Sequence, residues 1–101
     1  MDETKLCMDC SAKIDSENVI SRELEGETVI LDMKTGTYLG LNPVGTRMWA
    51  LIQKHGSLRK VFEELQNEYE VPANTLERDL LQLVDQLSTK GLVSLGAVDG
   101  R

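Results

Sequence analysis

Two cysteines near the N-terminus have a spacing that is used for metal binding and for redox chemistry. Cys7 and Cys10 enclose two residues, as in half of a zinc knuckle. A tetrahedral zinc site needs four ligands, and the sequence offers only Asp9 nearby and His55 from elsewhere. We therefore expect no bound metal and keep Cys7 and Cys10 as weak candidates. The simpler interpretation is that Cys7 and Cys10 belong to a polar tail and have no function of their own.

The chain has few of the residues that catalysis requires. His55 is the sole histidine, and it stands beside Gly56, where a cation interacts favourably with the end of a helix. No serine lies in a Gly-x-Ser-x-Gly elbow, and the eight glycines are scattered rather than gathered in a phosphate-binding loop. We expect a surface or capping role for His55, and a protein that is not an enzyme and holds no cofactor.

One apolar segment could bind a peptide through backbone hydrogen bonds, without any catalytic side chain. The segment is Thr37-Tyr38-Leu39-Gly40-Leu41, and it lacks the Lys, Pro and Glu that commonly protect an open sheet edge. As a strand it would direct Leu39 and Leu41 to one face and Tyr38 and Gly40 to the other. We expect an edge strand that accepts a guest peptide strand. The alternative is an edge that the tail or a helix covers.

This strand is predicted to be the third of an antiparallel meander. Residues 18–24 and 28–33 form the first two strands, the second with alternating apolar side chains. Glu25-Gly26 and Lys34-Thr35-Gly36 supply the two tight turns. A short segment at 92–95 is a candidate for one more strand.

Three helices are predicted to follow the strands. Their boundaries are marked by Asn42-Pro43, Gly56, Ser57, Val71-Pro72, the capping-box-like Asn74-Thr75-Leu76-Glu77, and Gly91. Trp49 in the first helix is expected in the core. Strands followed by helices indicate an α+β fold of winged-helix-like arrangement, a three-stranded antiparallel meander followed by three helices.

The third helix is expected to form a wall beside the edge strand. Its core stripe contains Leu76, Leu80, Leu83 and Leu87, and Leu81 lies to the side of that stripe. The apolar surface of this helix is therefore wider than one core contact needs. The candidate peptide-binding residues of the helix are Arg78, Leu81, Gln82, Val84 and Asp85.

Composition limits the partners. The net charge is −6 with no basic run, which disfavours nucleic acid. Neither a membrane span nor a signal peptide is evident, so we expect a cytoplasmic protein. Residues 1–17 are expected to form a disordered tail whose deletion leaves the fold intact. Residues 18–95 are expected to form the domain, and residues 96–101 a second tail.

The segment from Leu31 to Leu51 carries an aspartate closing the second strand, a Thr-Gly turn, an aromatic strand ending in Leu-Asn, a glycine in the first helix, and an aliphatic-Trp pair. This combination resembles the signature of the PqqD-like family of precursor-peptide recognition elements. Downstream, Leu65, Glu68-Tyr69, Asp79 and Gly91-Leu92-Val93 also fit, so the resemblance spans about residues 19–93.

The resemblance implies a non-catalytic domain that binds the leader of a ribosomally made precursor peptide as an added strand. It would present that peptide to a radical S-adenosylmethionine enzyme, another modifying enzyme or a leader peptidase, in PQQ synthesis or a related pathway. We expect a monomer, with a dimer as the alternative. The competing interpretations are a winged-helix DNA-binding regulator and a metal-dependent redox protein using Cys7 and Cys10.

Overall fold

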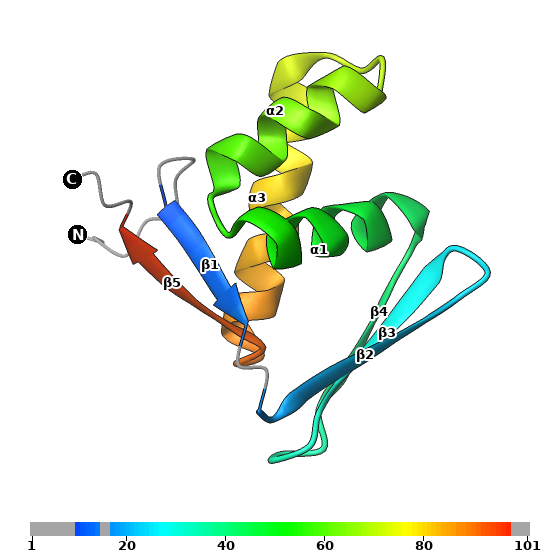
Figure 1. The fold of residues 1–101 in the computed structure, drawn as a ribbon, viewed down its shortest axis with the longest axis vertical. Coiled ribbons are helices and arrows are strands. Elements are labelled where there is room, and N and C mark those ends of the chain that lie inside the picture. Colours follow the sequence, from blue (N-terminus) through cyan, green and yellow to red (C-terminus); the bar gives the residue numbers. More distant parts are fainter. Residues whose placement is uncertain (1–9, 15–16, 98–101) are drawn as a thin grey trace.

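The computed structural model describes residues 10–14 and 17–97, which form two small sheets and three helices. The elements follow one another as β1 (Cys10–Ile14), β2 (Val19–Leu24), β3 (Glu27–Asp32), β4 (Tyr38–Leu41), α1 (Pro43–His55), α2 (Leu58–Glu68), α3 (Ala73–Thr89) and β5 (Val93–Ala97). In Figure 1, α1 crosses between the β1–β5 pair and the three-stranded sheet, with α3 behind it. The predicted α+β, winged-helix-like fold, with a three-stranded meander followed by three helices, is confirmed.

The meander has the order β2-β3-β4, with both pairs antiparallel. Gly26 and Gly36 take positive φ values of 82° and 80° in the two turns, as turns this tight require. β4 therefore has one paired side, against β3, and lies at an edge of the sheet.

A buried carboxylate fixes the turn that leads into β4. Asp32 accepts hydrogen bonds from the Lys34 amide (2.9 Å) and from the Thr35 hydroxyl (3.2 Å). The Asp32 amide itself donates to the Thr37 carbonyl over 2.8 Å. The turn and Thr37, which directly precedes β4, are thus held in one network, which sets the register of β4 on β3.

The first two helices begin where their capping residues predict. The Asn42 carbonyl oxygen Oδ1 accepts from the Gly45 amide (2.8 Å), and Ser57 Oγ accepts from the Lys60 amide (3.4 Å). The capping box expected at Asn74 is wrong, because α3 already begins at Ala73, after Pro72, without a side-chain cap. The Pro72 carbonyl accepts the first helical hydrogen bond, from the Leu76 amide (3.1 Å), so Pro72 is the N-cap and the helix begins before Asn74.

One apolar core joins the helices to both sheets. Trp49 is buried, with 3% of its surface exposed, and its indole N–H donates to Ser21 Oγ over 3.2 Å. This contact ties α1 to β2 and confirms the expected core role of the tryptophan. The buried apolar side chains are Ala12, Val19, Ile30, Leu41, Met48, Trp49, Leu51, Ile52, Leu58, Val61, Leu65, Leu76, Leu80, Leu83, Val84, Leu87, Leu92 and Val93.

The expected disordered tail is wrong for residues 10–14, which form β1 and pair with β5 in antiparallel register. Ala12 is 4% exposed, and its amide donates to the Gly56 carbonyl over 2.8 Å. A polar segment can join a fold through its backbone when a partner strand is available, and β5 supplies that partner. β5 also extends to Ala97, past the expected end of the domain. Residues 1–9, 15–16 and 98–101 lie outside the described part.

Candidate functional site

Within residues 10–14 and 17–97, no strand pairs with the outer side of β4, so this side presents unpaired backbone groups. Because the Thr37 carbonyl is bonded to β3, the alternation of an antiparallel ladder turns Leu39 and Leu41 toward β3 as well. The amides and carbonyls of Tyr38 and Gly40 consequently face away from β3, toward the free edge. Gly40 adds no side chain to this edge, and a Cβ placed on it would meet open space.

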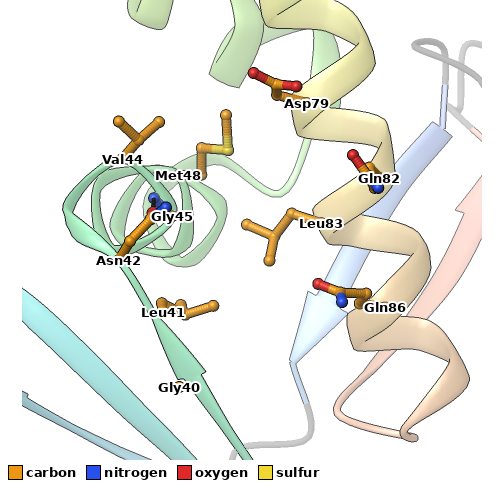
Figure 2. A pocket seen from close by; sticks show the side chains of 10 residues that line it. All are labelled: Gly40, Leu41, Asn42, Val44, Gly45, Met48, Asp79, Gln82, Leu83 and Gln86. Carbon is orange, nitrogen blue, oxygen red and sulfur yellow. Dashed lines mark hydrogen bonds between the residues drawn. The ribbon is translucent and has the colours of Figure 1, made fainter.

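A hollow of about 410 Å³ lies beside this edge, between β4, the start of α1 and one face of α3 (Figure 2). Its lining residues are Gly40, Leu41, Asn42, Val44, Gly45, Met48, Asp79, Gln82, Leu83 and Gln86. We call this hollow, together with the open side of β4, the β4–α3 groove. Leu41, Met48 and Leu83 give it an apolar floor that is continuous with the core.

The α3 wall of the groove is polar. Asp79, Gln82 and Gln86 are exposed and recur at helical spacing, so that they follow one side of the helix around Leu83 (Figure 2). Within the described residues, none of these three side chains makes a hydrogen bond or an ion pair. The groove therefore combines an apolar floor, an unpaired backbone edge and a row of free polar groups.

The structure brings some of the predicted site residues to the groove. Gly40, Leu41 and Gln82 line it, and Tyr38 contributes its outward backbone groups. The Tyr38 side chain is 69% exposed on the outer face of the sheet, and Leu39 is half-buried against the core. Thr37 lies in the turn network, where its amide and its Oγ1 both contact Thr35 Oγ1.

The other predicted residues of α3 do not line the groove. Val84 is fully buried, and Leu81 is half-buried and packs against the core, so the expected apolar wall beyond the core stripe is not there. At ~100° per residue, Leu81 lies about 160° around the helix from Leu83. Arg78 and Asp85 are exposed but lie outside the lining.

Sequence reasoning missed most of the residues that form the hollow. These are Asn42, Val44, Gly45, Met48, Asp79, Leu83 and Gln86. One available signal was the spacing of Asp79, Gln82 and Gln86, a polar stripe beside a core leucine. The start of α1 could not be placed at the groove without the packing of Gly45 on Leu41.

The remaining polar candidates have local structural roles. His55 Nε2 lies 2.7 Å from Glu64 Oε2, which links the end of α1 to α2. Arg47 and Glu68 form a bidentate pair between the same helices, and this pair lowers the pKa of the Glu68 carboxyl. Across residues 10–14 and 17–97, no three His, Cys, Asp or Glu side chains gather to hold a metal. Cys10 begins β1, and Cys7 lies outside the described residues.

No helix in the described ranges is both long and apolar enough to cross a membrane.

The chain and its fold belong to a known class of protein. The family described as Coenzyme PQQ synthesis protein D (PqqD) matches residues 27–93, and the chain belongs to this family. The match covers the second and third strands of the meander, all three helices and the start of β5. No curated protein sequence matches the chain.

Two solved structures share the fold. One is described as TbiB1 in complex with the TbiA(beta) leader peptide. It is 36% identical, covers 86% of this chain and 99% of that chain, and has a TM-score of 0.75. The other is described as lasso peptide synthetase B1 complexed with the leader peptide. At 24% identity, 85% and 98% coverage and a TM-score of 0.69, it supports the fold alone.

Proposed function

We propose that this chain binds the leader of a ribosomally made precursor peptide and presents it to a modifying enzyme or a leader peptidase. The observation that carries the proposal is the open β4 edge beside a groove with an apolar floor. An added strand gains affinity from main-chain hydrogen bonds and specificity from pockets for alternate side chains. In this protein the open edge of β4, which supplies the main-chain groups, lies beside the apolar floor, which supplies the pocket.

Family membership and the more similar solved structure support the same function. The 36% identical structure has a leader peptide bound, and it aligns with nearly its whole length to this chain. Strand addition to the β4–α3 groove would place the guest backbone against Tyr38 and Gly40. One guest side chain in every two would point between Leu41 and Leu83.

Presentation to an enzyme requires a second surface, and the outer face of the meander offers one. Its exposed apolar side chains are Ile20, Leu24, Val29 and Tyr38, and the half-buried Leu31 lies among them. A guest strand on β4 would continue this face with its own outward side chains. We place the modifying enzyme on this composite face, because an enzyme docked there contacts the sheet and the leader together.

The chain itself contributes no catalysis in this scheme. It acts where the ribosome delivers the precursor, in the cytoplasm. A DNA-binding function, which winged-helix folds also serve, has less support, since the polar wall of α3 carries a carboxylate at Asp79 and no cation.

The test is the affinity of a fluorescent synthetic peptide covering the leader of a short precursor encoded beside this gene. Gly40→Pro removes an outward-facing amide and places a proline ring at the edge, a position where proline is tolerated in folded sheets. Gly40→Ala keeps the amide and meets open space, so it is the matched control. We expect at least tenfold weaker binding for Gly40→Pro and wild-type binding for Gly40→Ala. Equal affinity of the two variants would contradict strand addition at β4.

A further inference from the structure

We propose that the leader carries a basic residue two positions before its apolar anchor, and that the basic side chain pairs with Asp79. This inference rests on the proposed function and specifies the class of peptide that the groove accepts. The anchor is the guest side chain that enters the floor formed by Leu41, Met48 and Leu83.

Asp79 provides the charge for this pairing. Among the residues that line the groove, Asp79 is the one with an ionisable side chain. It is exposed, and the described residues give it neither a hydrogen bond nor an ion pair. A guest strand laid in the groove displaces water from around the carboxylate, which strengthens its attraction for a cation and its repulsion of an acidic side chain.

Helix and strand geometry set the spacing. Asp79 and Leu83 are four residues apart on α3, which corresponds to about 6 Å along the helix axis. Two residues of a strand cover about 6.6–6.8 Å, and side chains two apart point to the same face. A guest side chain at the level of Leu83 therefore has its neighbour on the same face at the level of Asp79.

The relative directions of β4 and α3 set the order. In Figure 2 the chain rises from Gly40 to Leu41 and descends from Asp79 through Gln82 to Gln86. Figure 1 shows the same opposite directions for the whole elements. A guest that continues the antiparallel sheet runs opposite to β4, and so passes Asp79 before Leu83. The pattern is Lys or Arg, any residue, then an apolar residue.

The test is selection from a displayed library of random 12-residue peptides on the full chain. The Asp79→Asn and Asp79→Lys variants are selected in parallel, and Glu63→Gln is the control. Glu63 is an exposed carboxylate on α2 that lines no part of the groove. With the wild type and the control, we expect Lys or Arg enriched two positions before an apolar residue. Asp79→Asn should lose the basic preference and keep the apolar one, and Asp79→Lys should enrich Asp or Glu instead.

A peptide from the wild-type selection should bind Asp79→Asn roughly 3- to 10-fold more weakly, and the difference should shrink at high salt. Two failures are distinguishable. If binders are recovered without a basic preference, or if all variants share one preference, the Asp79 pairing is wrong and peptide binding stands. If no binders are recovered, or if those recovered still bind Gly40→Pro fully, the proposed function fails with it.

Discussion

Gly45 lies against Leu41 where α1 begins. A Cβ placed on Gly45 would stand 3.3 Å from the Leu41 Cβ and 3.3 Å from Asn42 Oδ1, closer than ordinary contact. The first turn of α1 can therefore rest directly on the end of β4. This close approach positions Leu41 and Met48 as the floor of the groove, so the groove depends on the absence of a side chain at residue 45.

Gly45→Val should destabilise the protein by about 1–3 kcal/mol, because two branches must enter a space that is already filled. Ala50→Val, on the exposed side of the same helix, should cost only about 0.5 kcal/mol in helix propensity. Urea unfolding of both variants measures the difference. Equal costs would mean that the helix start moves away from β4 without loss.

The strand β1 should contribute measurably to stability. Ala12→Asp places a carboxylate in a buried position and should cost roughly 2–4 kcal/mol. Lys13→Asp introduces an aspartate at the neighbouring, exposed position and should lower the free energy of unfolding by less than about 1 kcal/mol. Thermal unfolding distinguishes the two. If Ala12→Asp unfolds like the wild type, β1 does not pack on the domain.

Leu83 and Leu81 test which side of α3 forms the groove. Leu83→Ala should cost roughly 2–5 kcal/mol of stability and about tenfold in leader affinity, because Leu83 serves both the core and the groove floor. Leu81→Ala removes a half-buried side chain on the other side. Leu81→Ala should cost less stability than Leu83→Ala and leave leader affinity within about twofold. A larger loss of leader affinity for Leu81→Ala than for Leu83→Ala would mean that the peptide binds on the Leu81 side of α3.

The outer face of the meander should act after leader binding. Ile20→Asp puts a charge on this face, two strands away from β4, and should leave leader affinity unchanged. Modification of the full precursor by its enzyme should fall about tenfold, since the docked enzyme would bury that charge. The control is Gln66→Asp, which introduces the same negative charge at an exposed position of α2. Unchanged modification by Ile20→Asp would exclude this face as the docking site.

The strands and the first two helices could be predicted because their signals are local. Alternation over residues 28–33, glycines at 26 and 36, and the capping residues Asn42 and Ser57 each determine the backbone near themselves. β1 could not be predicted, since its few apolar residues gain a place only through pairing with β5, about eighty residues away in the sequence.

The rotation of α3 also depended on distant contacts. Leu81, Leu83 and Val84 are all apolar, and periodicity alone does not show which of them faces β4. The packing of Gly45 on Leu41 and of Met48 beside Leu83 decides that direction, and it puts Asp79 rather than Asp85 on the groove (Figure 2).

Amide hydrogen exchange, followed residue by residue with and without the leader peptide, tests strand addition most directly. The amides of Tyr38 and Gly40 face the open edge and should become protected on binding, whereas that of Leu39 is already bonded to β3 and should change little. The other open edge is a built-in comparison. The Asn18–Met33 bond turns the amides of the exposed residues Ser21 and Glu23 outward on β2, and these should stay unprotected. New protection at those two amides, with none at Tyr38 and Gly40, would contradict a leader strand on β4.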